Sequence, residues 1–208
     1  QLMKLMGGLG TMLQGALQGT GGGKAAPGGG PGGGVQQGMK RMDTMVRDLA
    51  SFTTAHEVAH QYFAGLVGSD CRRHPALDEP LAQYAAYRYE AHRRGAEAGR
   101  LLLDTNARLN YGLYRMLGGK DGPAARPLEG FKSPLQYAAL VYGKAPYLYL
   151  RLRDELGAKR FDRALRAAVQ RHRFRLVTLD RWVQSLSRAA GGGKAGASSL
   201  GALSSPRP

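Results

Sequence analysis

The sequence contains little of several residue types, and each shortage limits what the chain can be. Cys71 is the single cysteine, so no internal disulfide bond can form. No run of about twenty apolar residues occurs, so the sequence predicts no membrane-spanning helix. The alternation of apolar and polar residues that is typical of strands is also rare, and only residues 175–177 suit a short extended piece. We therefore expect a mainly α fold.

Acidic residues are scarce as well, since 15 of them face 30 lysines and arginines, for a net charge of +15. The excess is strongest in a basic belt made of Arg151, Arg153, Lys159, Arg160, Arg163, Arg166, Arg171, Arg173 and Arg175. Such a belt can bind phosphate backbones or anionic lipid. The interpretation that we favour is a solvated surface of arginine-rich helices. No nucleic-acid-binding motif accompanies the charge, so we do not expect nucleic acid as a partner.

Glycine is abundant at both ends of the chain and predicts its division. Residues 7–38 are dominated by glycine, and the end of the chain is rich in glycine, serine and alanine. Segments with so little to bury are expected to stay flexible. We predict a flexible segment over residues 1–40, a helical folded domain over 41–190, and a disordered tail over 191–208.

The stretch from Thr54 to His60 carries the most specific motif of the chain. His56 and His60 are four residues apart, so a helix places both imidazoles on one face, where they can bind one zinc ion. Glu57 is offset from that face and can act as a base, which is the H-E-x-x-H arrangement of a metallopeptidase. Asp43 is the predicted N-cap, and the buried stripe is predicted to contain Met45, Leu49, Phe52, Ala59, Phe63 and Leu66. The alternative is a pair of hydrogen-bonded core histidines.

A catalytic zinc ion takes three protein ligands, and Glu79 is the candidate for the third. Asp78 suits the N-cap of a second helix, with Glu79 and Pro80 in its first turn. Asp78 is also a candidate to support the ligands from behind, although capping explains it equally well.

The motifs together resemble a known family. H-E-x-x-H at 56–60, eighteen further residues and then Glu79 resemble the gluzincin pattern of the aminopeptidase N and leukotriene hydrolase family. The flanks agree, since Gln61-Tyr62-Phe63 is similar to that family's Q-W-F. Residues 141–145 are similar to the segment that carries its catalytic tyrosine, which the resemblance assigns to Tyr142, with Tyr137 as the nearest substitute. The resemblance covers about residues 43–188.

The resemblance implies the helical half of a gluzincin (thermolysin-like) catalytic domain that hydrolyses peptide bonds. His56, His60 and Glu79 would hold one zinc ion, Glu57 would act as general base, and Tyr142 would stabilise the oxyanion. The implied partners are a peptide or protein substrate and the upstream part of a larger protein. Pro80 and Gly143 depart from the family pattern. No G-x-M-E-N segment, which captures the free amino terminus in aminopeptidases, occurs upstream.

Two other functions stay open at this point. One is a non-catalytic, zinc-bound interaction domain, which has no physical need of Glu57 or Tyr142. The other is a basic, nucleic-acid-associated metalloprotease, in which a histidine ligand would follow closely behind the motif. The next histidine after His60 is His74, which argues against this second alternative.

Overall fold

The computed structural model describes residues 33–191 and divides the chain into two compact units, 1–44 and 45–208. Most of the predicted flexible segment and nearly all of the predicted tail lie outside the described residues. Within the first unit, residues 33–44 are the beginning of a helix, so Asp43 lies inside this helix and the prediction that it is the N-cap was wrong. The domain bounds given above therefore stay a prediction. The second unit carries the predicted site.

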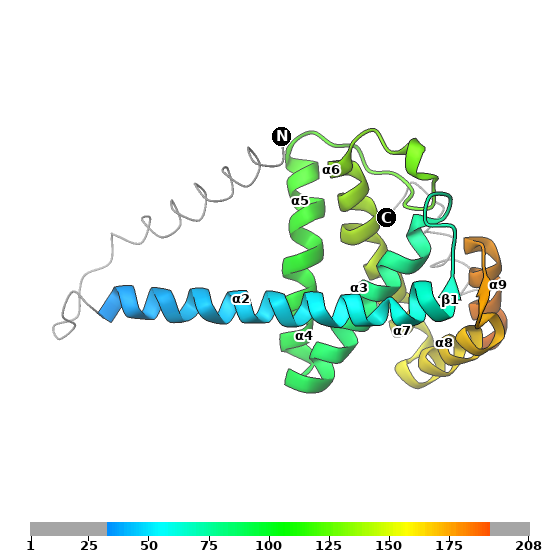
Figure 1. Cartoon of the computed structure of the whole chain (residues 1–208), viewed down its shortest axis with the longest axis horizontal. Coiled ribbons are helices and arrows are strands. Elements are labelled where there is room, and N and C mark those ends of the chain that lie inside the picture. Colours follow the sequence, from blue (N-terminus) through cyan, green and yellow to red (C-terminus); the bar gives the residue numbers. More distant parts are fainter. Residues whose placement is uncertain (1–32, 192–208) are drawn as a thin grey trace. The chain divides into compact units, whose positions relative to one another are not determined.

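Helices make up most of the described chain, as predicted (Figure 1). In chain order the elements are α2 (Gly33–Ala59), η1 (Gln61–Leu66), β1 (Val67–Gly68), α3 (Pro75–Arg94), α4 (Ala96–Leu103), η2 (Asp104–Arg108), α5 (Leu109–Met116), η3 (Leu128–Gly130), α6 (Pro134–Tyr137), η4 (Ala138–Lys144), α7 (Ala145–Leu156), α8 (Ala158–His172), β2 (Arg175–Leu176) and α9 (Leu179–Ala189). The expected extended piece is β2, which pairs in parallel with β1. Within the described range, no helix is both long and apolar enough to cross a membrane.

Helix α3 lies at the centre of the second unit, because it contacts α4, α7, η1 and η4. Helices α7, α8 and α9 then pack in succession. The largest fully buried side chains join these layers, and they are Trp182, Tyr84, Tyr149, Phe52, Phe161, Leu77, Leu81, Leu103, Leu140, Leu152 and Leu186. The core therefore surrounds the helix that bears Glu79.

The start of α3 differs from the prediction. The helix begins at Pro75, not at Asp78, because a turn in which the His74 amide donates to the Asp70 carbonyl (2.7 Å) leads directly into it. Pro75 suits this place because a first-turn residue needs no N–H partner. Pro80 consequently lies inside the helix, where it cannot donate a bond to the preceding turn.

The predicted apolar stripe of α2 is only partly buried. Phe52 and Ala59 are buried as expected, and Phe63 is buried in the following η1. Met45 and Leu49 are about half exposed, so for these two residues the prediction was wrong. Three-four spacing identifies one face of a helix but does not show how far along the helix that face is covered.

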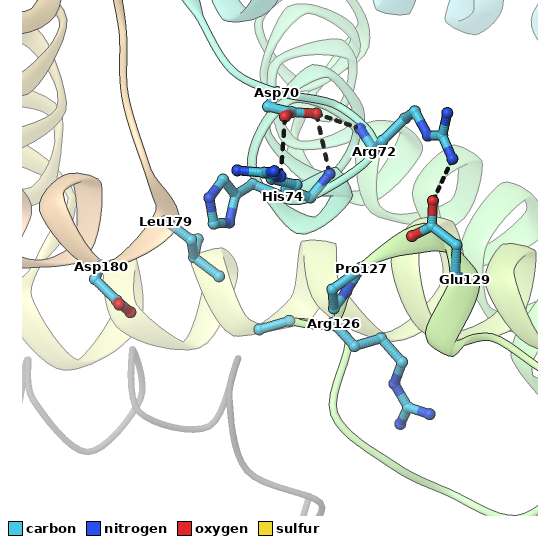
Figure 2. A pocket seen from close by; sticks show the side chains of 10 residues that line it. Asp70, Arg72, His74, Arg126, Pro127, Glu129, Leu179 and Asp180 are labelled. Atoms are coloured by element: carbon cyan, nitrogen blue, oxygen red, sulfur yellow. Dashed lines mark hydrogen bonds and ion pairs between the residues drawn. The ribbon is translucent and has the colours of Figure 1, made fainter.

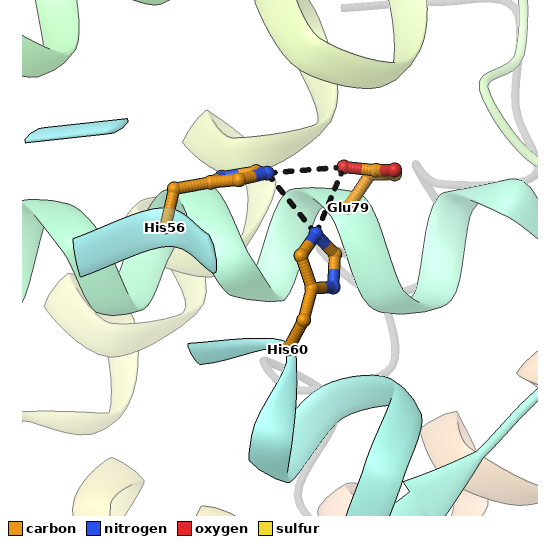
Figure 3. A group of neighbouring side chains, drawn as sticks. All are labelled: His56, His60 and Glu79. Atoms are coloured by element: carbon orange, nitrogen blue, oxygen red, sulfur yellow. Dashed lines mark hydrogen bonds and ion pairs between the residues drawn. The ribbon is translucent and has the colours of Figure 1, made fainter. Parts of the chain in front are cut away.

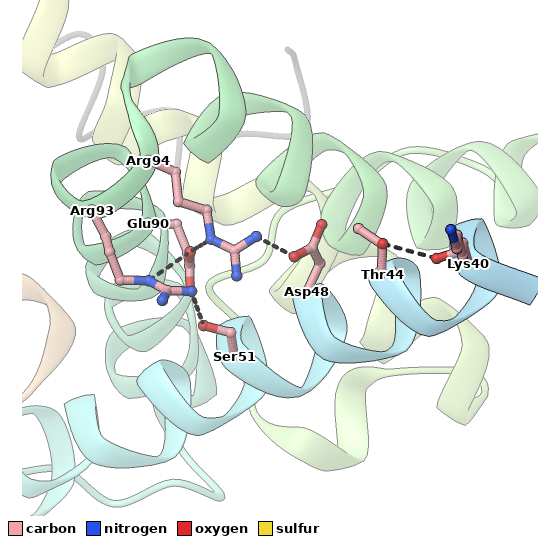
Figure 4. A network of polar contacts seen from close by, with 7 residues as sticks. All are labelled: Lys40, Thr44, Asp48, Ser51, Glu90, Arg93 and Arg94. Carbon is pink, nitrogen blue, oxygen red and sulfur yellow. Dashed lines mark hydrogen bonds and ion pairs between the residues drawn. The ribbon is translucent and has the colours of Figure 1, made fainter. Parts of the chain in front are cut away.

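A polar network joins α2 to α3 (Figure 4). Glu90 of α3 is completely buried, and its carboxylate accepts a hydrogen bond from the Ser51 hydroxyl of α2 and pairs with Arg94 Nε at 2.8 Å. Arg94 also pairs with Asp48 of α2. A buried carboxylate is stable only with such partners. Because Asp48 and Ser51 precede the histidines while Glu90 and Arg94 follow Glu79, the paired parts of the two helices run antiparallel.

This network makes Glu90 a strong determinant of stability. We expect Glu90→Ala to lower the free energy of unfolding by about 3 kcal/mol, because it removes a buried, paired charge. The measurement is urea denaturation. As a control, Asp162→Ala removes a carboxylate that pairs with Arg88 at 2.8 Å but is 43% exposed, and it should cost less than about 1 kcal/mol. Equal losses in the two variants would contradict this role for Glu90.

Candidate metal centre

The two histidines of the motif lie where α2 ends. His56 is in its last turn, whereas His60 falls between α2 and the π-helical η1. The Gly65 amide donates to the His60 carbonyl at 2.9 Å, and Phe63 has the non-helical angles φ −104° and ψ 43°. π-Helical turns are rare and are often found at functional sites. Here the wide turn directly follows a candidate ligand.

The structure brings His56, His60 and Glu79 together (Figure 3). The Nε2 atoms of the two histidines are 3.1 Å apart, and Glu79 Oε2 lies 3.2 Å from His56 Nε2 and 3.4 Å from His60 Nε2. Ligand atoms around a tetrahedral zinc ion, each about 2.0–2.2 Å from the metal, are about 3.3 Å or slightly more from one another. The triangle therefore has the size and the donor types of a site for one such ion.

The charge of Glu79 suits the same use. Burial disfavours its ionised form, but hydrogen bonds with His56 and Tyr142 and the nearby His60 outweigh burial, so the pKa of Glu79 is lowered. A metal ligand of this kind must be deprotonated. The carboxylate is thus ready to bind without a large change in protonation.

The side chains next to the three donors differ from the supporting side chains that metal sites usually have. His56 Nδ1 is buried and has no hydrogen-bond partner among the described residues, whereas ligating histidines usually donate from this second nitrogen. Asp78, the predicted supporting residue, instead accepts from the Glu79 amide at 2.8 Å. Burial raises the pKa of Asp78, although that amide bond opposes the shift. The bond to Glu79 is a local one at the start of α3.

Tyr142 lies beside the triangle. Its ring centre is 6.2 Å from that of His56, and its hydroxyl forms a hydrogen bond with the Glu79 carboxylate. Burial raises the pKa of Tyr142, and the neighbouring carboxylate raises it further, so the hydroxyl keeps its proton at neutral pH. The sequence pattern gave Tyr142 as a candidate but gave no sign of its bond to Glu79.

Tyr137 packs against Tyr142. The two rings meet edge to face with centres 5.7 Å apart, and their hydroxyls are hydrogen-bonded. Burial, followed by the charges of Glu79 and Asp78, raises the pKa of Tyr137 to about 12. Tyr137 is thus a neighbour of Tyr142 as well as its nearest substitute.

Gly143 explains how Tyr142 reaches this place. An added Cβ at Gly143 would lie 2.9 Å from the Ala107 carbonyl oxygen and 3.0 Å from Tyr111 Cβ. Only glycine permits so close an approach of η4 to η2 and α5. The departure from the family pattern at this position therefore has a packing reason.

Glu57, the predicted base, is exposed on α2 next to His56. Its side chain is not one of the three grouped donors, as expected for a residue that is offset from the ligand face. This arrangement leaves Glu57 free of a ligand role and accessible to water. Its role as a base stays a prediction.

A cleft with a volume of about 680 Å³ lies apart from the triangle, since none of the three donors lines it (Figure 2). Several of the charged side chains that line it already have polar partners. Arg72 pairs with Glu129, Arg73 pairs with Asp70 at 3.6 Å, and Arg126 donates to the Pro123 carbonyl at 2.8 Å. Among the described residues, the side chains grouped closely enough to hold a metal ion are His56, His60 and Glu79, so these three stay the candidate site.

Comparison with known families agrees with this geometry. A model described as the peptidase family M1 domain matches residues 39–200. The chain belongs to peptidase family M1. This confirms the resemblance to aminopeptidase N-like enzymes and supports a peptidase function in general terms, in a family that is zinc-dependent in general. No curated protein and no solved structure was found to match the chain.

The geometry of this M1 domain predicts which carboxylate holds the metal. Glu79→Ala should lower zinc affinity more than about a hundredfold, because it removes one of three ligands, which costs more than the loss of a supporting partner. The affinity is measured by competition with a chelator, and the zinc content by elemental mass spectrometry. Asp78→Asn keeps an oxygen for the Glu79 amide and should change affinity little. If Glu79→Ala bound zinc like the wild type, the third ligand would lie elsewhere.

Proposed function

We propose that this M1 chain hydrolyses peptide bonds at a zinc ion held by His56, His60 and Glu79. The observation that carries the proposal is the triangle of donor atoms with sides of 3.1–3.4 Å. When bound, zinc supplies Lewis-acid chemistry, since it polarises a carbonyl and makes water more acidic. The hydrogen bond of Glu79 with Tyr142 helps to hold the ligand carboxylate in place.

Glu57 is the proposed general base. Its place one residue after His56 puts a carboxylate beside the ligand face without making it a ligand. Glu57 accepts a proton from the water molecule that attacks the scissile carbonyl carbon. It then passes this proton to the amide nitrogen as the C–N bond breaks, so the products are a carboxylic acid and an amine.

Tyr142 is the proposed donor to the oxygen that becomes negative during attack. Its neutral hydroxyl is a donor, and its present acceptor is the Glu79 carboxylate, so a small rotation exchanges one negatively charged acceptor for another. The ring contact and hydrogen bond with Tyr137 limit how far Tyr142 can move. Donors fixed in advance lose little energy in reorganising at the moment of reaction.

Replacing the proposed base tests whether the centre is catalytic. Glu57→Gln should abolish hydrolysis of a mixed peptide library, and mass spectrometry of the library measures that hydrolysis. The zinc content of the variant should stay that of the wild type. Hydrolysis is lost because the amide cannot accept the proton from water. Retained turnover would remove Glu57 as the base. A wild-type chain that binds zinc but cleaves no peptide would instead favour the non-catalytic interaction domain.

Removing one hydroxyl tests the oxyanion role. Tyr142→Phe should lower kcat about a hundredfold and leave zinc affinity within a few fold, because only a transition-state donor is lost. Tyr137→Phe is the matched variant, since it removes the neighbouring hydroxyl and should have a smaller effect. If Tyr137→Phe lowered kcat more than Tyr142→Phe, Tyr137 would be the donor.

A further inference from the structure

The connection between α8 and α9 exposes apolar side chains within a basic surface. We call residues 171–176, which run from the last turn of α8 to the end of β2, the 171–176 loop. Phe174 is 80% exposed and Leu176 is 77% exposed, which makes them the two most exposed large apolar residues of the described chain. Arg171, Arg173 and Arg175 alternate with them and are also exposed. Apolar groups in water are unfavourable, so a pair of them surrounded by arginines marks a surface that meets something else.

The backbone of this loop is held firmly in place. The Phe174 amide donates to the Leu66 carbonyl at 2.6 Å, the Val177 amide donates to the Gly68 carbonyl at 2.9 Å, and β2 pairs with β1 between these bonds. Phe174 has φ 59°, in the left-handed region, and is the only described non-glycine residue with a positive φ. This conformation costs an aromatic residue free energy. The fold thus keeps Phe174 projecting outward although the exposure of its ring to water and its left-handed backbone conformation are both unfavourable.

The charge around the loop is strongly positive and uncompensated. Arg171, Arg175 and Arg181 all act on His172, whose pKa is lowered by burial first and by these three guanidinium groups next. Within residues 33–191, none of these three arginines forms an ion pair with a carboxylate, and neither does Arg173, whose guanidinium lies 6.0 Å from the centre of the Phe174 ring. Three members of the basic belt, Arg171, Arg173 and Arg175, therefore lie beside the two exposed apolar side chains.

We propose that the 171–176 loop docks the protein on an anionic lipid surface. The arginines meet the phosphate head groups, while Phe174 and Leu176 enter the boundary between head groups and acyl chains. A nucleic acid would satisfy the arginines and could stack a base on Phe174, but it would leave the aliphatic Leu176 in water. The combination of an aromatic with an aliphatic side chain favours lipid. This docking does not depend on the metal centre.

The test is co-sedimentation of the whole chain with vesicles. We expect binding to phosphatidylglycerol mixed with phosphatidylcholine, much weaker binding to phosphatidylcholine alone, and weakening by salt. Arg173→Ser should lower the partition coefficient about fivefold. Arg115→Ser, an exposed arginine of α5, is the matched control and should have little effect. No preference for the anionic vesicles would overturn the proposal.

Phe174→Gly separates docking from folding. Glycine adopts φ 59° without strain, so this variant should be at least as stable to urea as the wild type. Its vesicle partition coefficient should nevertheless fall about tenfold, because the aromatic ring is lost. Leu101→Ser is the apolar control, since Leu101 is 66% exposed on α4 and should not affect partition. Unchanged binding by Phe174→Gly, or binding of duplex DNA without binding of vesicles, would contradict docking on lipid.

Discussion

The antiparallel contact between α2 and α3 is the constraint on which the candidate metal centre depends. Glu79 and Glu90 are eleven residues apart on α3, which is about three helical turns, so both carboxylates face α2. One meets His56 and His60, and the other meets Ser51. A slip of one residue between the helices would break both contacts at once. The buried carboxylate of Glu90 therefore fixes the separation of the ligands even though it lies far from them along the helix.

Helices with wider turns complete the site. His60 directly precedes the π-helical η1, and Tyr142 belongs to the π-helical η4. A π turn accommodates one residue more than an α turn and changes the direction of the side chains that follow. Regular α-helices form the scaffold of the candidate site. The wider turn of η4 sets the direction of Tyr142, whereas η1 begins directly after the candidate ligand His60.

Much of the fold and of the candidate site was predictable from local sequence patterns. The H-E-x-x-H spacing and the family resemblance predicted the grouping of His56, His60 and Glu79, which the structure brings together. The start of α3 was not predictable, because Asp78 and Pro75 both suit a helix start and only the preceding turn decides between them. The π turns, the exposure of Met45 and the bond between Tyr142 and Glu79 depend on contacts between distant segments. The spacing of apolar residues along the sequence does not reveal such contacts.

The tight approach at Gly143 has a consequence for how the chain can change. Any atom added at position 143 would collide with the Ala107 carbonyl oxygen and with Tyr111. A single substitution of Gly143 by a larger residue such as glutamate would therefore displace η4 and, with it, Tyr142. The atoms in the way are the backbone carbonyl oxygen of residue 107 and the Cβ and backbone nitrogen of Tyr111, and a change of side chain at 107 would leave that carbonyl oxygen in place. Room for a side chain at position 143 therefore requires a shift of the backbone itself, so we expect this position to stay glycine as long as η4 keeps its present packing.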